Sequence, residues 1–277
     1  MQQQRQELCV IGDRVQMQHN GDGSGSIVQI YPRDRALSRV EPGGFSGTQA
    51  ERQQVIVANL DQTIFVFAAA NPAPHPRMLD RFLVVAEKAE IPSIHIAVNK
   101  VDLITPEAVH HIFDPYARIG YAVHYVSAQS GEGLTELADL LHDQLSVLTG
   151  PSGVGKSSLL NQIQPDLGRA VGRVSEATTK GRHTTVYSEL IPVAGGGYVA
   201  DTPGIRSIAP WDVEPTELDA YFIEFKPYIP HCRYKDCMHS DEPGCALRAA
   251  VEAGQVSRAR YESYLKLQAE LNELYIY

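Results

Sequence analysis

The glycine-rich segment at residues 150–158 has the residue types that bind phosphate groups. It follows an apolar run and opens a stretch with helical periodicity, which is the context that a phosphate-binding loop requires. Its glycines let backbone amides turn toward the phosphates, Lys156 reaches the β and γ oxygens, and Ser157 can hold Mg²⁺. A glycine-rich turn with an incidental lysine is the alternative. The expected phosphate-binding residues are Gly150, Pro151, Ser152, Gly153, Val154, Gly155, Lys156, Ser157 and Ser158.

A second motif, Asn99-Lys100-Val101-Asp102, predicts which base is bound. The Asp102 carboxylate can accept two hydrogen bonds from guanine, whereas adenine lacks that pair of donors and would leave the carboxylate unpaired. Lys100 would lie across the ring, and Asn99 would contact the other edge of the base or tie two loops together. A strand-end turn with solvated side chains is the alternative. Ser127-Ala128 ends the next predicted strand, where a backbone amide can meet guanine O6, and this favours guanine recognition.

The segment Asp201-Thr202-Pro203-Gly204 also ends an apolar run. There Asp201 can reach the Mg²⁺ shell and Gly204 can swing toward the γ-phosphate, although an ordinary turn would have the same composition. The polar segment 178–185 between the phosphate loop and Asp201 is the natural first switch. Its hydroxyls could complete the magnesium shell. The expected magnesium ligands are Ser157, Thr184 and Asp201.

The residue after Gly204 is Ile205, where many GTPases have a glutamine that orients the attacking water. An aliphatic side chain cannot orient water. Turnover is therefore slow until a partner binds, or another group positions the water. His183 is the nearest polar candidate by sequence and is our catalytic hypothesis, with a solvent-exposed loop histidine as the equal alternative.

Three cysteines and a histidine lie within fourteen residues near the C-terminus. Three thiolates and an imidazole make a closed tetrahedral site, which is typical of structural zinc because no position is left for water or substrate. Unliganded buried cysteines or an iron–sulfur cluster are the alternatives. The expected zinc ligands are Cys232, Cys237, His239 and Cys245.

The elements that must position these loops alternate between strands and helices, which indicates a parallel sheet covered on both faces. Predicted strands are 63–70, 93–99, 122–127, 145–149, 185–193 and 197–201. Predicted helices are 77–89, 106–117, 134–141 and 156–162. Ahead of them, short β segments at 10–18 and 26–31 suit a small barrel. After Pro210 we expect a helix near 215–222, the cysteine cluster and a helical stretch over 255–274.

Composition limits the classes of function. The chain has 277 residues, 43% of them hydrophobic, and a formal charge of −9, which argues against a globally basic nucleic-acid binder. It has no run of about 20 apolar residues and no signal-peptide character at its start, so we expect a cytoplasmic protein without a membrane partner. Clustered cysteines beside histidine fit a reducing compartment.

Basic residues gather in two regions that could contact RNA locally. Such clusters are usually solvated faces, and both regions also contain acidic residues. A small barrel beside a charged patch is nevertheless a common RNA platform. The residues are Arg5, Arg14, Arg33, Arg35 and Arg39 near the N-terminus, and Arg233, Lys235 and Arg248 around the cysteine cluster.

The order of these motifs resembles one family closely over nearly the whole chain: the RsgA family, also called YjeQ or YloQ, of circularly permuted GTPases that act in assembly of the small ribosomal subunit. The base-recognition motif precedes the phosphate loop, and the Gly181–Thr185 segment, Asp201–Gly204 and the cysteine cluster follow. This combination is far more specific than any single motif.

The resemblance implies an α/β fold with three parts: an N-terminal OB-fold barrel over residues 1–52, a circularly permuted GTPase domain over 53–210, and a C-terminal helical zinc domain over 211–277. It also implies GTP and GDP as ligands, hydrolysis stimulated by the small subunit, and ribosomal RNA as principal partner. We expect a monomer. The family has further strands ahead of Leu8, so we expect a shortened or incompletely closed barrel, with exposed strand edges.

Two other functions compete with a partner-stimulated GTPase. An RNA-binding placement factor could use GTP mainly as a conformational ligand, and Ile205 keeps that alternative open. A P-loop kinase or ATPase is disfavoured by the Asn99–Asp102 motif. Because the second switch runs directly into the zinc domain, we also expect residues 205–211 to transmit the nucleotide state to residues 230–277.

Overall fold

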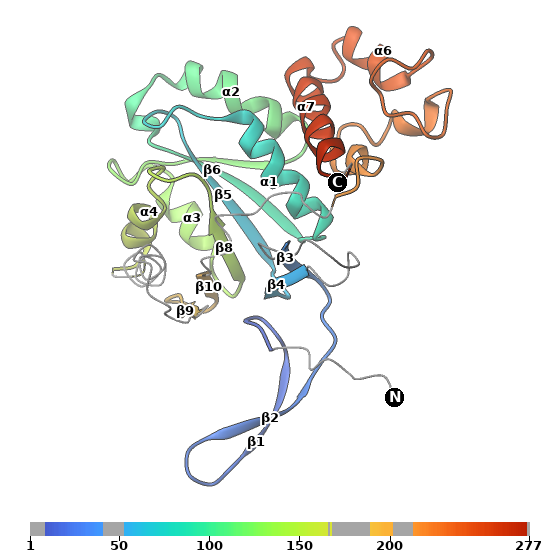
Figure 1. Cartoon of the computed structure of the whole chain (residues 1–277). Coiled ribbons are helices and arrows are strands. Elements are labelled where there is room, and N and C mark those ends of the chain that lie inside the picture. Colours follow the sequence, from blue (N-terminus) through green and yellow to red (C-terminus); the bar gives the residue numbers. More distant parts are fainter. Residues whose placement is uncertain (1–8, 41–52, 166, 168–188, 202–212, 276–277) are drawn as a thin grey trace, which may run out of the picture.

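The computed structural model describes residues 9–40, 53–165, 167, 189–201 and 213–275. Within these ranges the chain forms a central sheet with helices on both faces, two N-terminal strand pairs and a C-terminal helical domain (Figure 1). None of the described helices is both long and apolar enough to cross a bilayer.

The central sheet has six strands in the order β7-β6-β5-β8-β10-β9. All neighbours run parallel except β9, which is antiparallel to β10. The parallel sheet that the sequence predicts is confirmed, with strand ends close to the predicted ones. The strands are β5 (Gln62–Ala68), β6 (Ser93–Asn99), β7 (Ala122–Tyr125), β8 (Leu145–Thr149), β9 (Glu189–Pro192) and β10 (Tyr198–Asp201).

Alternate side chains of β5 explain why helices cover both faces. Phe65 and Phe67 pack into one core cluster with side chains of α1 and α2, whereas Ile64, Val66 and Ala68 pack into another with side chains of α3 and α4. Because every residue of β5 is buried, the strand is apolar throughout rather than alternating. The helices are α1 (Pro76–Lys88), α2 (Pro106–Arg118), α3 (Leu134–Leu140) and α4 (Lys156–Ile163).

The N-terminal strands form two antiparallel pairs. β1 (Val15–His19) pairs with β2 (Gly25–Ile30), and β3 (Ala36–Val40) pairs with β4 (Gln53–Ala58). No described strand joins the two pairs into a closed barrel. This agrees with the expected shortened or incompletely closed barrel. In the second pair, β3 comes before residue 52 and β4 comes after it. The predicted end of the N-terminal part at residue 52 therefore falls between two paired strands.

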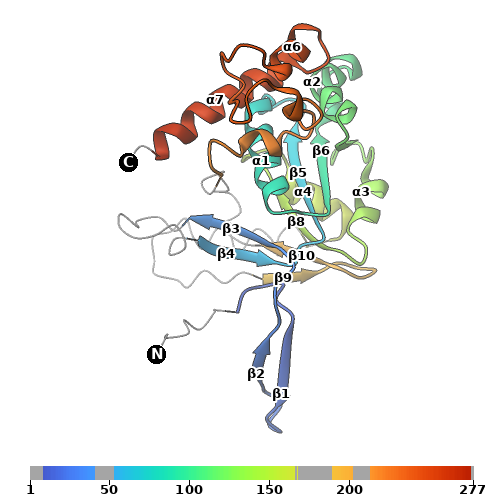
Figure 2. The ribbon, with the colours of Figure 1, turned by 90° about the vertical axis from the view of Figure 1, so that its right-hand side faces the viewer.

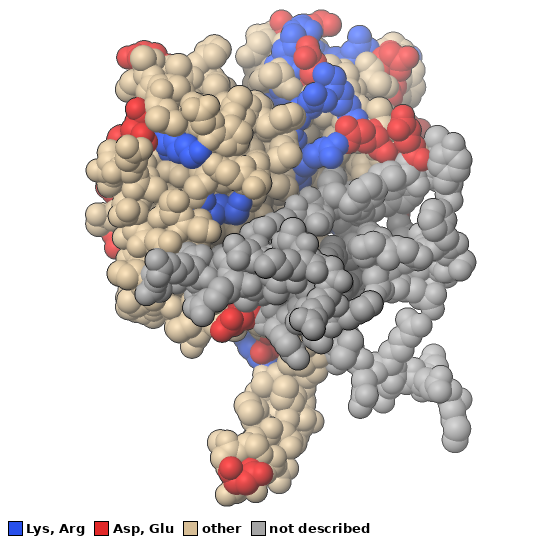
Figure 3. Space-filling view, turned by 60° about the vertical axis from the view of Figure 1, so that its left-hand side comes forward, with Lys and Arg blue, Asp and Glu red and all other residues tan. Residues whose placement is uncertain are grey.

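The two pairs differ in what they bury. From the second pair, Leu37 and Val57 pack into the core of the central domain. The first pair projects from the body as a hairpin, and its surface in Figure 3 is uncharged except for an acidic tip. Met17, Ile27 and Val28 of this hairpin are about half exposed.

The C-terminal domain has its own core. Phe222 and Phe225 stack within it, the Tyr264 ring meets both edge to face, and Leu267 and Leu271 of α7 complete the cluster. Its helices are α6 (Ala246–Glu252) and α7 (Arg258–Tyr275), and Figure 2 shows α7 lying beside α1.

The helix expected near residues 215–222 is wrong. The segment holds a single 3-10 turn, Leu218–Tyr221. Leu218 and Phe222 are buried in the domain core, while the Asp219 carboxylate reaches His239, and these long-range contacts override the local helical pattern.

Candidate nucleotide site and metal centre

The predicted nucleotide motifs meet at one edge of the sheet. The phosphate loop follows β8, Asn99 ends β6, Ser127 follows β7 and Asp201 ends β10. Since parallel strands place their carboxyl ends at the same edge, loops that lie up to 100 residues apart converge there. Ligands of open α/β sheets bind in this position.

Close contacts with neighbouring atoms explain why two positions of the phosphate loop are glycine. Gly150 and Gly155 have φ of +152° and +94°. A Cβ atom at Gly150 would lie 2.0 Å from the carbonyl oxygen of Val66, and one at Gly155 would lie 2.4 Å from Nδ2 of Asn99. Only glycine allows the loop to approach its neighbours this closely.

Lys156 is the first residue of α4, and its ammonium group lies against the phosphate loop. Nζ donates to the carbonyl oxygens of Gly150 at 2.7 Å and Pro151 at 2.8 Å. Ser157 and Ser158 are exposed in the first turn of α4, while Val154 is buried. The lysine charge and the helix N-terminus therefore favour an anion at the same place.

Asn99 joins the base-binding loops to the phosphate loop. It is 1% exposed. Its Nδ2 donates to the carbonyl oxygen of Val154 at 2.8 Å, and its Oδ1 accepts from the backbone amide of Ala128 at 3.1 Å. The sequence left two roles open for Asn99, and in the structure its side chain ties two loops together. The Ala128 amide, expected near guanine O6, is hydrogen-bonded to Asn99.

Lys100 and Asp102, which follow Asn99, are held by separate hydrogen bonds. Lys100 has a left-handed backbone with φ +65°, and its Nζ donates to the carbonyl oxygens of Gly153, at 2.7 Å, and Asn71. Asp102 is exposed, and its Oδ1 accepts a 2.5 Å hydrogen bond from Ser127 Oγ. Val101 lies between them and is partly buried. Ser127 thus fixes the carboxylate that is expected to face guanine.

Ser127 is itself fixed by the loop that it opens. Its Oγ accepts the amides of Gln129 at 3.1 Å and Ser130 at 3.0 Å, and the residue is fully buried. The Asp102 carboxylate is therefore positioned by a buried hydroxyl rather than by solvent.

Several predicted residues lie outside the described part of the chain. These are His183, Thr184, Gly204 and Ile205, together with segments 178–185 and 205–211. Asp201 is described as the last residue of β10, paired with Glu189, by its backbone alone.

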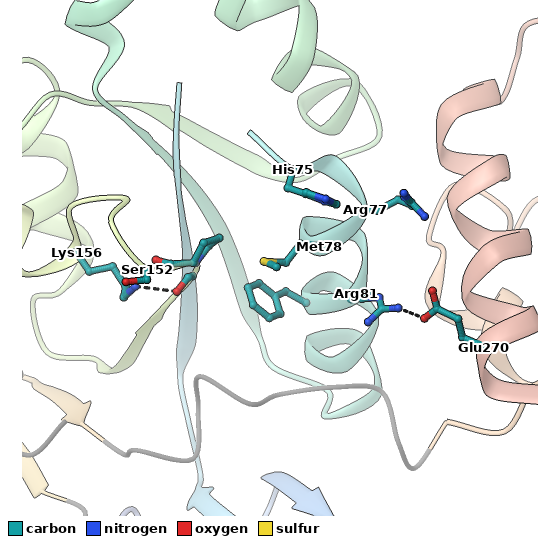
Figure 4. Close-up of a pocket in the computed structure, with 10 residues that line it drawn as sticks. His75, Arg77, Met78, Arg81, Ser152, Lys156 and Glu270 are labelled. Atoms are coloured by element: carbon teal, nitrogen blue, oxygen red, sulfur yellow. Dashed lines mark hydrogen bonds and ion pairs between the residues drawn. The ribbon is translucent and has the colours of Figure 1, made fainter. Parts of the chain in front are cut away.

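Sequence reasoning missed a cavity of about 570 Å³ beside the phosphate loop. Figure 4 shows that helix α1 and Glu270 of α7 lie across this cavity from Lys156. The sequence signal that could have pointed to this cavity is the pair Arg77 and Arg81, which lie four residues apart on one face of α1. The lining residues are His75, Arg77, Met78, Arg81, Phe82, Gly150, Pro151, Ser152, Lys156 and Glu270.

The four predicted zinc ligands come together in the C-terminal domain. The donor atoms of Cys232, Cys237, His239 and Cys245 all lie within 4.8 Å of one another. His239 Nδ1 is 3.5 Å from the Cys232 sulfur and 3.4 Å from the Cys245 sulfur, and these two sulfurs are 3.9 Å apart. Tetrahedral zinc with N and S ligands needs donor separations of about 3.5–3.8 Å. The donor set and its spacing therefore fit such an ion.

The surroundings orient His239 toward the sulfurs. Its Nε2 lies 3.0 Å from the Asp219 carboxylate, and its backbone, at φ +59°, accepts a 2.6 Å hydrogen bond from Tyr261 Oη. A carboxylate on the outer nitrogen of a ligating histidine fixes the ring and the tautomer. Burial lowers the pKa of His239, but hydrogen bonds to Asp219 and Cys245 outweigh it and raise the pKa to about 9.

Cys245 connects the cluster to helix α6. It is the N-cap residue, and its sulfur accepts from the Arg248 amide at 3.4 Å. The same residue therefore caps α6 and belongs to the cysteine cluster, which ties the cluster to the helix.

Comparison with known proteins agrees with this geometry. A profile of the RsgA GTPase family matches residues 30–211. The chain is 48% identical over 263 residues to the small ribosomal subunit biogenesis GTPase RsgA of Gemmatimonas aurantiaca, covering 94% of this chain and 84% of that protein. It is 39% identical to the protein of the same name from Shewanella oneidensis, covering 95% and 75%.

Solved structures agree as well. YjeQ from Thermotoga maritima matches with a TM-score of 0.78 at 35% identity, over 97% of this chain and 86% of that one. YloQ, described as a circularly permuted GTPase, matches with a TM-score of 0.74 at 28% identity, over 98% and 83%. With its base-recognition motif ahead of its phosphate loop, this GTP-hydrolysing chain belongs to the RsgA GTPase family.

Proposed function

We propose that this GTPase acts in biogenesis of the small ribosomal subunit, and that the subunit stimulates its hydrolysis of GTP. Relatives that match most of the chain carry this role in their names. The observation that carries the GTP-binding part is Asn99, which joins the phosphate loop to the loop of Ser127 and Ala128, where Ser127 donates to the Asp102 carboxylate.

The proposed nucleotide contacts follow the motifs. Asp102 selects guanine, Lys100 covers the ring, and residues 150–158 hold the phosphates. Mg²⁺ would be held by Ser157, Thr184 and Asp201, and would neutralise charge on the phosphates. Gly204 contacts the γ-phosphate, and His183 orients the attacking water in place of the glutamine that Ile205 replaces.

The proposed metal of the cysteine cluster is one structural zinc ion. Four protein ligands leave no open position, so the ion would hold the C-terminal domain together without taking part in hydrolysis. The 3-10 turn and α7 meet at this cluster through Asp219 and Tyr261, which supports a structural role.

Ribosomal RNA is the proposed partner, contacted mainly by the C-terminal domain. Arg14 pairs with Asp34 and Arg33 pairs with Asp13, so these two N-terminal arginines already have acidic partners. Arg233 instead lies over the exposed ring of Tyr234, 5.5 Å from its centroid. Exposed basic and aromatic side chains together suit unpaired RNA bases.

Three coarser assignments complete the proposal. The chain acts as a monomer in the cytoplasm, where small subunits are assembled. It divides into the three parts 1–52, 53–210 and 211–277.

GTP turnover should be measured with small subunits, with large subunits and with neither. Small subunits alone should raise kcat by at least tenfold. Equal rates in all three mixtures would instead support a placement factor that uses GTP mainly as a conformational ligand, the alternative that Ile205 keeps open. His183→Ala should lose the stimulated rate, and an unchanged stimulated rate would remove His183 from the proposal.

A further inference from the structure

Helix α1 contacts the C-terminal domain through charged side chains along much of its length. Near its start, Asp80 pairs with Arg260 of α7 at 2.6 Å. At its last residue, Lys88 pairs with Glu217. Between them lies Arg81, which pairs with Glu270 of α7 (Figure 4). The same helix lines the cavity beside the phosphate loop, so it borders both the nucleotide site and the C-terminal domain.

The Arg260 contact is a fixed anchor. Arg260 is 4% exposed and also forms a bidentate pair with Glu224, at 2.7 and 3.0 Å. Tyr116 donates a 2.8 Å hydrogen bond to the same Asp80 carboxylate. Removing one partner of a buried, fully hydrogen-bonded charge pair is strongly unfavourable, so the first turn of α7 is held firmly against α1.

The Arg81–Glu270 contact is of a different kind. It lies ten residues farther along α7, about 15 Å from the anchor by helical rise. Both side chains are partly exposed, 39% for Arg81 and 45% for Glu270. Exposed ion pairs typically contribute about 0–1 kcal/mol, so this contact can open without unfolding either domain.

The guanidinium of Arg81 points toward Glu270 (Figure 4), but the residue also borders the nucleotide site. It lines the same cavity as Gly150, Ser152 and Lys156. Burial and the nearby charge of Arg77 lower the pKa of the Arg81 guanidinium, which shows that positive charge is crowded on this face of α1. A negative partner is therefore favourable there, and Glu270 is the partner that the structure supplies.

We propose that the Arg81–Glu270 ion pair is the contact through which the C-terminal domain restrains GTP hydrolysis. While the pair is closed, Glu270 neutralises Arg81 and holds it toward α7. When α7 moves away around the Arg260 anchor, the guanidinium is free to add positive charge to the cavity beside the phosphate loop. That charge stabilises the negative charge that builds on the terminal phosphate in the transition state.

The inference rests on GTP hydrolysis itself and not on the small-subunit role, so it is tested without ribosomal subunits. Glu270→Gln keeps the size of the side chain and removes its charge. We expect kcat of the free protein to rise about three- to tenfold, with KM for GTP within twofold of the parent value. The double variant R81Q/E270Q should return kcat to the parent rate or below, because the gain needs the released guanidinium.

Glu217→Gln is the matched control. It removes the carboxylate partner of Lys88 on the same helix, but Lys88 does not line the cavity. Its kcat should equal that of the parent, and thermal unfolding should show that all variants are folded. An E270Q rate equal to the parent, a gain that survives R81Q, or an equal gain in E217Q would overturn the proposal and leave Arg81–Glu270 as a plain docking contact.

Discussion

The nucleotide site and the metal centre are assembled in opposite ways. In the nucleotide site, Asn99 links residues that lie 29 and 55 positions away, and both its amide nitrogen and its amide oxygen have a partner in the protein itself. In the metal centre, four donors from one stretch of fourteen residues face one another. The first site is therefore held by the sheet that positions its loops, whereas the second depends on an ion to hold its donors together.

Metal removal should have the largest effect, and only on one of the two regions. Without the ion, three thiol groups and an imidazole crowd within 4.8 Å with no cation to hold them together, so the C-terminal domain should lose its fold. Structural zinc sites contribute about 10 kcal/mol or more to folding. Hydrogen exchange of residues 213–275 after chelation should approach that of an unfolded chain.

The GTPase body provides the control for that experiment. Strands β5 and β6 should keep their protection, because their cores contain none of the metal-binding residues. Cys237→Ser should reproduce the result without a chelator. Equal loss of protection in both regions would mean that the two are not separable.

Asn99→Ala should have the next largest effect, at the nucleotide site. The change leaves the Val154 carbonyl and the Ala128 amide without a partner, at a cost of about 1–3 kcal/mol. We expect GTP affinity measured by calorimetry to fall about 10- to 100-fold, with hydrogen exchange of the C-terminal domain unchanged. Affinity within twofold of the parent would show that Asn99 does not position the loops.

Ser127→Ala should weaken GTP binding less. It removes the hydroxyl that donates to Asp102 but leaves the carboxylate in place. One hydrogen bond to a charged group is worth about 1.5–3 kcal/mol, part of which bound guanine would recover. A loss of about tenfold is expected, and Ser130→Ala, three residues away in the same loop and outside the Asp102 contact, is the control.

Replacing one member of a histidine pair in the sheet should have the smallest effect, and only the free energy of unfolding should change. His95 Nδ1 lies 3.0 Å from His124 Nε2, and burial together with His124 lowers the pKa of His95 to about 4. The unfolded chain takes up this proton near pH 6.5 and the folded one only near pH 4, so folding is weakened as the pH falls through that range. His95→Gln should remove about 1 kcal/mol of that loss, measured by urea unfolding at pH 7 and pH 5.

The sequence predicts the parts of this molecule that depend on local pattern. Apolar runs locate the strands, and the glycines at 150 and 155 mark a loop whose neighbours leave no room for a side chain. Cys232 to Cys245 can be recognised because all four donors are close in sequence. The parallel order of the strands then brings the nucleotide motifs to one edge.

Contacts between distant segments could not be predicted in the same way. Arg260 and Asp80 are 180 positions apart, and neither has a spacing that identifies the other. Arg81 and Glu270 look like solvated charges on two amphipathic helices until the helices are placed side by side. The hydrogen bond from Lys100 to the carbonyl oxygen of Asn71 could not be predicted from the sequence either. The wrong helix near residues 215–222 has the same origin, since long-range anchors of Leu218 and Asp219 decide its conformation.

Selection of guanine through Asp102, in a loop ahead of the phosphate loop, distinguishes this nucleotide site from a general phosphate-binding loop. The most direct test is the dissociation constant of GTP and of xanthosine triphosphate for the parent and for Asp102→Asn. The amide should lower GTP affinity at least 100-fold and raise affinity for the xanthine nucleotide, because the amide donates a hydrogen bond where the carboxylate only accepted. Unchanged GTP affinity in the Asp102→Asn protein would contradict selection of guanine by Asp102.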